Sequence, residues 1–261
     1  MVFCSDLDNT LIYSYKHEIG SDKKCVEIYQ GREVSYMTNR SCRLLREVRE
    51  RMLFVPTTTR TVEQYGRVTF EEGAPEYALV CNGGVLLVNG KQDSAWYAQS
   101  RDMAADSKQA LQDAVRILET DGNVNFEVRY IEQLFVFTKS MEPQQTAFRL
   151  REYLQGSPVE VFSHGVKVYV VPKKLNKGEA IRRFRGRVQA GAVAAAGDSK
   201  FDIPMLEAAD FAIADKGLRS EHISGSHVAY RGERIFSDEV LEYVLALYGE
   251  EGRKDARNGN L

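Results

Sequence analysis

The first eleven residues restrict the fold of this chain more than any other stretch. A short apolar run, Val2 to Cys4, is followed by carboxylates at Asp6 and Asp8 and then by Asn-Thr. A short apolar run that ends in polar residues is typical of a buried strand in a parallel sheet. Open sheets of this kind bind ligands at the carboxyl ends of their strands. The sequence therefore predicts an α/β fold whose first strand carries Asp6 and Asp8 to a ligand site.

Asp6 and Asp8 lie two positions apart. In an extended strand they would point to the same side, whereas a turn at Asp8 would let them flank one site in different roles. Two close carboxylates are unfavourable unless a cation lies between them or one of them keeps a proton. Alone, the pair also fits a solvated turn, so the rest of the chain has to distinguish the two interpretations.

Two further apolar runs also end in polar residues. Leu53-Phe54-Val55 leads into Pro56-Thr57-Thr58-Thr59-Arg60, and Tyr77 to Cys81 leads into Asn82-Gly83-Gly84. Three threonines before a helix start near Thr61 offer hydroxyl groups and backbone amides to an anion, although they also fit a simple helix cap. Asn-Gly-Gly fits an ordinary hairpin turn as well.

The second half of the chain adds a lysine and two more acids. Lys177 directly precedes a helix that we expect to begin near Gly178. A helix N-terminus favours anions, so a lysine is not preferred at this position, but with an anionic substrate the ammonium and the helix amides can bind the same phosphate. A strand of small residues ends at Gly197-Asp198, and Asp202 follows four residues later, so both carboxylates can face one point.

In this order, the fragments resemble the four motifs of the haloacid dehalogenase (HAD) superfamily of phosphohydrolases. The first motif is similar to Asp6-Leu7-Asp8-Asn9-Thr10-Leu11, and the others correspond to Thr58, to Asn176-Lys177-Gly178, and to Gly197-Asp198 with Asp202. The Cof-like branch commonly has Thr-Gly-Arg in the second motif, whereas Thr59 stands at the glycine here. Both Thr57 and Thr58 therefore remain candidates for the phosphate contact. An Asn-Gly similar to Asn82-Gly83 lies near the substrate in that branch.

Residues 85–171 have a different pattern from the rest of the chain. Helix, strand, strand occurs twice, with helices expected near 103–119 and 143–154, which predicts an antiparallel sheet with two helices. We expect an α/β, Rossmann-like parallel-sheet core domain (1–84 and 172–261) and an inserted α+β cap domain (85–171). The insertion is similar to the large cap of Cof-like and sucrose-phosphatase-like HAD phosphatases.

The resemblance implies roles for these residues. Asp6 is the expected nucleophile, forming an aspartyl-phosphate, and Asp8 the expected general acid and base. Thr58, Lys177 and Asn82 are expected to bind phosphate or substrate. The expected cofactor is Mg²⁺, held by Asp6, the backbone carbonyl of Asp8 and Asp198, while Asp202 either binds the metal directly or orients Asp198 and the metal waters. The expected function is hydrolysis of a small phosphorylated metabolite, most simply a sugar phosphate or glycosyl phosphate. A sugar phosphomutase and a non-catalytic sugar-phosphate-binding regulator remain alternatives.

Composition bears on partners and compartment. The formal net charge of −2 disfavours nucleic acid or an anionic membrane as a partner. The cysteines are scattered without a C-x-x-C pair, which fits a reducing compartment: Cys4, Cys25, Cys42 and Cys81. Residues 1–15 lack the basic region of a signal peptide, and no uncharged run reaches the roughly 20 residues of a spanning helix. We expect a cytoplasmic protein, a monomer or weak homodimer, that binds a small phosphorylated molecule.

Overall fold

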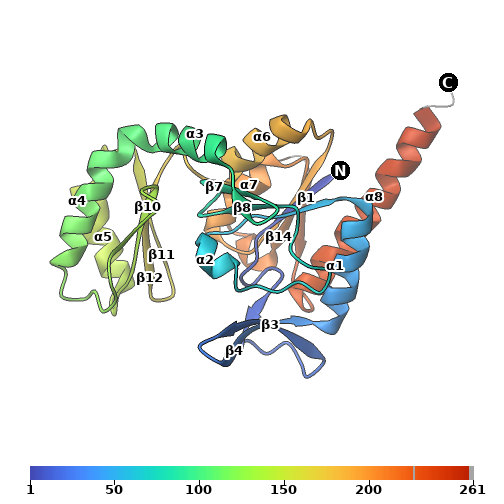
Figure 1. Ribbon diagram of the computed structural model, residues 1–261, viewed down its shortest axis with the longest axis horizontal. Helices are drawn as coiled ribbons and strands as arrows, with labels where there is room; N and C mark the ends of the chain where they lie inside the picture. Colours follow the sequence, from blue (N-terminus) through green and yellow to red (C-terminus); the bar gives the residue numbers. More distant parts are fainter. Residues whose placement is uncertain (226, 259–261) are drawn as a thin grey trace. The chain divides into compact units, whose positions relative to one another are not determined.

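The computed structural model describes residues 1–225 and 227–258. The chain forms two compact units (Figure 1). One unit consists of Met1–Gly83, Leu87–Lys91 and Lys177–Leu261, and the other of Gly84–Leu86 and Gln92–Asn176. The domain boundaries expected from the sequence, at 84/85 and 171/172, stay a prediction.

A five-stranded sheet in the order β15-β14-β13-β1-β5 forms the centre of the first unit. All four neighbouring pairs are parallel. The strands are β1 (Val2–Ser5), β5 (Leu53–Pro56), β13 (Val193–Gly197), β14 (Phe211–Asp215) and β15 (Val228–Arg231). Because parallel strands end at the same edge of a sheet, the residues that follow β1, β5 and β13 share that edge. The α/β prediction is confirmed, and β15 is a strand that the sequence analysis did not anticipate.

Helices cover both faces of this sheet. The helix α1 packs beside α8, and α6 packs beside α7, with the two pairs on opposite sides of the sheet (Figure 1). In α1, Cys42, Leu45 and Val48 form the buried face. The small side chains of β13 let helices approach it closely. The helices of this unit are α1 (Asn39–Arg51), α2 (Val62–Tyr65), α6 (Lys177–Val188), α7 (Ile203–Ala208) and α8 (Phe236–Asn258), with 3-10 turns at Lys200–Asp202 and Lys216–Leu218.

A small antiparallel sheet lies between β1 and α1 in the sequence. Its order is β2-β4-β3, with β2 (Tyr13–Ser14), β3 (Lys23–Tyr29) and β4 (Arg32–Thr38). The pairing of β3 with β4 shifts register on both sides of Glu27, as in a β-bulge. Bulges redirect side chains and are frequent beside functional sites. A further sheet contains β6 (Tyr77–Val80), β7 (Val85–Val88) and β8 (Lys91–Gln92).

The second unit is an antiparallel sheet packed against two helices. The sheet order is β11-β12-β10-β9, with β9 (Arg129–Ile131), β10 (Phe135–Lys139), β11 (Val159–His164) and β12 (Lys167–Pro172). Its core joins valines of the sheet, such as Val136 and Val168, to Leu111 and Leu118 of α4 (Lys108–Glu119) and Leu150 of α5 (Pro143–Tyr153). The α+β architecture is therefore confirmed.

The helix expected near 103–119 differs from the structure. Two helices occupy this region, α3 (Ser94–Ala104) and α4 (Lys108–Glu119), joined by a 3-10 turn at Ala105–Ser107. The α3 helix begins at an N-cap where Asp93 accepts a hydrogen bond from the Trp96 amide. Its sequence has only a weak apolar stripe, so periodicity did not reveal it.

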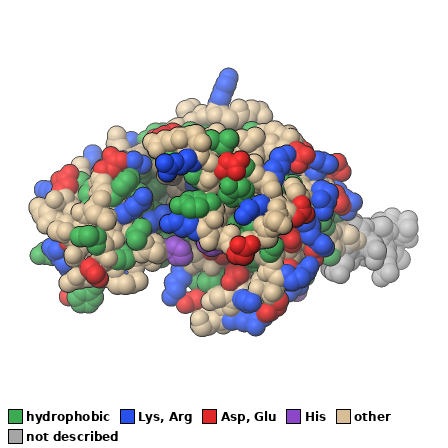
Figure 2. Space-filling view, turned by 90° about the horizontal axis from the view of Figure 1, so that it is seen from below, with side chains coloured by type: hydrophobic (Ala, Val, Ile, Leu, Met, Phe, Trp, Pro, Cys, Tyr) green, Lys and Arg blue, Asp and Glu red, His purple; other side chains and the backbone are tan. Residues whose placement is uncertain are grey.

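Acidic and basic side chains are interspersed on the face in Figure 2. Many surface charges form ion pairs, as in Arg46–Glu72 (2.9 Å) and Lys200–Glu221 (2.8 Å). Each exposed pair contributes little stability. No helix in the described part of the chain is both long and apolar enough to span a bilayer.

Candidate active site

The end of β1 places Asp6 beside the ends of its two neighbouring strands. The Asp6 amide donates to the Ala196 carbonyl of β13 at 2.9 Å. On the other side, the Thr57 amide donates to the Ser5 carbonyl at 2.7 Å. These hydrogen bonds continue the parallel ladders by one residue. They bring the residues that follow β1, β5 and β13 to one place.

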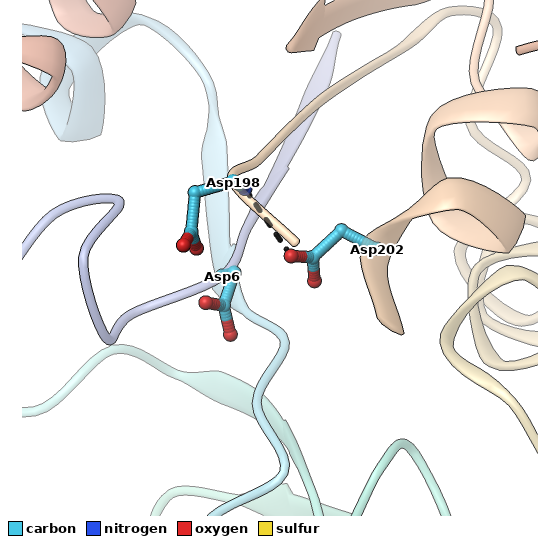
Figure 3. Close-up of side chains that lie close together, drawn as sticks. All are labelled: Asp6, Asp198 and Asp202. Atoms are coloured by element: carbon cyan, nitrogen blue, oxygen red, sulfur yellow. Dashed lines mark hydrogen bonds between the residues drawn. The ribbon is translucent and has the colours of Figure 1, made fainter. Parts of the chain in front are cut away.

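Three carboxylates come together at this edge. One carboxylate oxygen from each of Asp6, Asp198 and Asp202 lies within 4.8 Å of the other two. Figure 3 shows Asp6 below Asp198, with the Asp202 carboxylate turned toward them. The structure therefore brings together three of the four acids that the sequence analysis assigned to a metal.

Asp202 is held by the loop that carries Asp198. Its Oδ2 accepts hydrogen bonds from the backbone amides of Asp198 (3.2 Å) and Ser199 (2.9 Å) and from the Ser199 hydroxyl (2.8 Å). Gly197 makes this approach possible, because a Cβ atom there would lie 2.3 Å from the Asp202 Cβ. Asp202 thus fixes the backbone on which Asp198 is mounted.

Lys177, the first residue of α6, links two of these acids. Its Nζ donates to Asp6 Oδ1 and to Asp202 Oδ1, both at 2.6 Å, and its side chain is 1% exposed. Burial alone would lower the pKa of the Lys177 ammonium, but the carboxylates of Asp202 and Asp6 outweigh it and raise that pKa. The lysine is therefore a buried, permanent positive charge.

One ammonium does not balance three carboxylates. Burial, reinforced by the carboxylate of Asp202, raises the pKa of Asp198 to about 7. Burial also raises the pKa of Asp6 well above its ordinary value, and the nearby Lys177 does not offset this increase. A divalent cation would compensate the excess negative charge, and carboxylate oxygens are the ligands that Mg²⁺ prefers. The residues therefore fit a divalent metal.

The threonine segment lies beside this cluster. The Thr57 hydroxyl donates to the Val55 carbonyl (3.2 Å), whereas the Thr58 hydroxyl oxygen accepts from the Arg60 amide (3.2 Å) and keeps its own proton for donation. The backbone amide of Asn82 donates to the backbone carbonyl of Thr58 at 2.9 Å, and Asn82 has a positive φ of 59°. The structure thus places Asn82 next to Thr58, as one site would require.

Asp8 has different partners from Asp6. Arg60 binds it with two parallel hydrogen bonds, from Nε to Oδ2 (2.9 Å) and from Nη2 to Oδ1 (2.8 Å). Asp8 does not belong to the group of three close carboxylates. A metal contact through the Asp8 backbone carbonyl stays a prediction.

Three residues in the site received no role in the sequence analysis. Arg60 binds Asp8, Glu27 binds Arg60, and the Thr10 hydroxyl donates to Asp198 Oδ1 at 3.0 Å. Arg60 and Thr10 stand inside the quoted motifs, and that position is the sequence signal that could have identified them. Glu27 carries no comparable signal. It lies in a stretch where apolar and charged residues alternate, and nothing in the sequence distinguishes it from the other acids there.

A family model of haloacid dehalogenase-like hydrolases matches residues 86–216. The chain belongs to this family. The match confirms the family predicted from the four motifs. It includes Lys177, Asp198 and Asp202, whereas Asp6 and Thr58 lie before it in the sequence and join these residues only in the folded structure.

Solved structures of HAD-like proteins share the fold. The sucrose-phosphatase of Synechocystis matches with a TM-score of 0.62 and 18% identity, covering 95% of this chain and 98% of that chain. The C-terminal domain of C. albicans trehalose-6-phosphate phosphatase matches with a TM-score of 0.61 and 15% identity, covering 95% and 91%. A haloacid dehalogenase-like hydrolase from B. subtilis matches with a TM-score of 0.56 and 15% identity, covering 91% and 95%. None of the curated proteins compared with the sequence matches it.

Proposed function

We propose that this HAD-like hydrolase is a phosphatase that cleaves the phosphomonoester of a small sugar phosphate or glycosyl phosphate. The observation that supports it most directly is the cluster of Asp6, Asp198 and Asp202 beside the ends of β1 and β13, in which Lys177 of α6 binds Asp6 and Asp202. A carboxylate nucleophile, a divalent-metal site and a buried cation are the groups that phosphoryl transfer uses.

Asp6 is the proposed nucleophile. The hydrogen bonds from Lys177 to Asp6 Oδ1 and Asp202 Oδ1 fix the Asp6 carboxylate, so that Oδ2 can attack phosphorus. A bond forms between Asp6 and phosphorus while the bond from phosphorus to the ester oxygen breaks. The resulting aspartyl-phosphate divides one difficult displacement into two easier steps.

Asp8 is the proposed general acid and base. It donates a proton to the departing ester oxygen in the first step. In the second step it removes a proton from the water that attacks the aspartyl-phosphate and releases inorganic phosphate. An alkoxide leaving group, unlike a halide, requires this proton, which favours ester hydrolysis over dehalogenation.

The remaining residues bind and orient. Asp6, Asp198 and the Asp8 carbonyl would hold Mg²⁺, which when bound neutralises charge on the transferred phosphoryl group. Asp202 is proposed to orient the Asp198 loop, because both its oxygens are already engaged with Lys177 and backbone amides. Thr58 is favoured over Thr57 as the phosphate donor because Thr57 donates to its own strand.

The proposed substrate class rests on the structural relatives. The matching structures include a sucrose-phosphatase bound to sucrose and phosphate and a trehalose-6-phosphate phosphatase. Phosphorylated sugars are therefore the first compounds to test on this chain. Asp6 and Asp8 together favour an enzyme over a non-catalytic regulator, since binding alone does not need a nucleophile with a nearby acid.

Removing divalent metal tests the proposed chemistry. We expect phosphate release from a few members of a sugar-phosphate panel with Mg²⁺, and a loss of more than about 100-fold with EDTA. Colorimetric phosphate detection measures both. Equal rates with EDTA and with Mg²⁺ would contradict the metal role. Turnover only in the presence of a bisphosphorylated sugar would favour the phosphomutase, and binding without turnover would favour the regulator.

Replacing Asp202 by Asn tests its orienting role. The amide would place an N–H group against the Lys177 ammonium or against backbone amides, so the Asp198 loop would lose its fixed position. We expect the Mg²⁺ concentration for half-maximal activity to rise about 10- to 100-fold. Glu221→Gln is a matched control. Glu221 pairs with the exposed side chain of Lys200, which lies in the same 3-10 turn as Asp202. An unchanged Mg²⁺ requirement in Asp202→Asn would remove Asp202 from this role.

A further inference from the structure

The Arg60 side chain has three hydrogen-bond partners in the described part of the chain: Asp8, Glu27 and Gln64. Its Nε and Nη2 bind both oxygens of Asp8, Nη2 also donates to Glu27 Oε2 at 2.9 Å, and Nη1 donates to the Gln64 carbonyl at 3.3 Å. The Arg60 side chain is 11% exposed, whereas that of Asp8 is 46% exposed. A half-exposed carboxylate thus takes its position from a largely buried guanidinium.

Glu27 is the buried anchor of this arrangement. Its side chain is 4% exposed, and it accepts from Ser35 Oγ (2.6 Å), Arg60 Nη2 (2.9 Å) and Arg67 Nε (3.1 Å). The register shift of β3 at Glu27 turns this side chain inward, and an isolated bridge from Glu27 to Val68 fixes the strand there. The anchor therefore belongs to the small β2-β4-β3 sheet and not to the strands that carry the candidate catalytic residues.

Glu27 and Arg60 are both stabilised in their charged forms. Burial alone would raise the pKa of Glu27, but hydrogen bonds from Arg60, Ser35 and Arg67 outweigh it and lower the pKa. Burial alone would likewise lower the pKa of Arg60, but Asp8 and Glu27 outweigh it and raise that pKa. Buried ions with several hydrogen bonds keep one geometry, because any other would leave a charge without a partner.

We propose that Glu27 is a positioning residue: it holds Arg60 in place, and Arg60 in turn positions the side chain of Asp8, which when protonated is the proposed acid for the leaving group. This inference rests on the proposed phosphatase function. It adds Glu27, which lies 19 residues after Asp8 in the sequence, to the residues that serve that site. Glu27 itself touches neither the three-carboxylate cluster nor Lys177 in any contact described above.

The dependence on the leaving group distinguishes positioning from general structural support. An alkyl phosphate releases a strongly basic alkoxide and needs the proton of Asp8, whereas p-nitrophenyl phosphate releases a weakly basic phenolate that needs no acid. The ratio kcat/KM reports the first step, in which the leaving group departs. A misplaced Asp8 therefore slows the alkyl ester selectively, while a general distortion of the site slows both esters.

The experiment compares wild-type protein with Glu27→Gln on an alkyl sugar phosphate and on p-nitrophenyl phosphate. We expect kcat/KM for the alkyl ester to fall about tenfold and for the aryl ester less than about threefold. Arg60→Lys is the second variant, because an ammonium cannot bind both oxygens of Asp8, and it should show the same selective loss. Thermal unfolding of each variant verifies folding.

Glu63→Gln is the matched control. Glu63 pairs with the same Arg67 at 3.6 Å, but it is 83% exposed and does not contact Arg60. We expect it to hydrolyse both esters at the wild-type rate. Equal losses on the two esters in Glu27→Gln and Arg60→Lys, or no loss on either, would overturn the positioning role while the phosphatase proposal stands. Wild-type protein that hydrolyses neither ester would overturn the phosphatase proposal, and the inference with it.

Discussion

Replacing Asp6 by Asn is expected to abolish turnover and leave the protein folded. The amide has nearly the same shape, and the change removes one of three crowded carboxylates, so repulsion in the site decreases. An amide oxygen is a poor nucleophile, and loss of a nucleophile typically reduces kcat by more than about 10⁴-fold. We expect this reduction for every phosphorylated substrate, together with an unfolding temperature that is not lowered.

Two measurements verify this prediction. Steady-state phosphate release gives the rate, and mass spectrometry of acid-quenched reactions detects a phosphoryl group on the N-terminal peptide of the wild-type protein and not on that of Asp6→Asn. Asp22→Asn is the control, since Asp22 is exposed and accepts a hydrogen bond from Asn39. An Asp6→Asn variant that retains a near wild-type rate would exclude Asp6 as the nucleophile.

Replacing Lys177 by Met is expected to damage both stability and activity. The change leaves the carboxylates of Asp6 and Asp202 buried without their shared ammonium. Removing one partner of a buried ion pair costs about 3–5 kcal/mol of unfolding free energy. Losing a donor that contacts a developing charge costs about 10²- to 10³-fold in kcat. We therefore expect a lower denaturation midpoint and, at a temperature where the variant is folded, a large loss of turnover.

Divalent metal separates the two effects of this substitution. A bound cation compensates the carboxylates in part, so Mg²⁺ should recover more stability than activity in Lys177→Met. Lys174→Met is the control, because Lys174 is exposed and pairs with exposed Asp106. Urea unfolding with and without Mg²⁺, beside phosphate release, measures both quantities. A Lys177→Met variant with unchanged unfolding and turnover would contradict the role of the buried ammonium.

Much of the candidate site follows from local sequence. Each strand that delivers a site residue is a short apolar run followed at once by polar residues, as at Asp6, Thr58 and Asp198. In a parallel sheet this local pattern is enough, because all such strand ends meet at one edge. The helix that begins at Lys177 is likewise marked by its sequence. The fold class and the cluster of three acids could therefore be anticipated before any contact was known.

Contacts that depend on register and on distant partners could not be anticipated. Glu27 turns inward only because β3 shifts register there, and a shift of one residue reverses the face to which a strand side chain points. Similarly, whether Asp202 binds a metal or orients a loop depends on hydrogen bonds from the backbone of Asp198 and Ser199. The residue type alone therefore predicts neither the direction of the Glu27 side chain nor the role of Asp202.

The pairing of β1 has a consequence for how the protein is made. Val2 of β1 pairs with Val193 of β13, and Lys177 contacts Asp6 across 171 positions of sequence. During synthesis β1 and Asp6 leave the ribosome before β13 and Lys177, which lie more than 170 positions later in the sequence. Until then one edge of β1 has no neighbouring strand, and unpaired edges of apolar strands are prone to aggregate. The segment that carries Lys177 and β13 is therefore needed to protect this edge of β1.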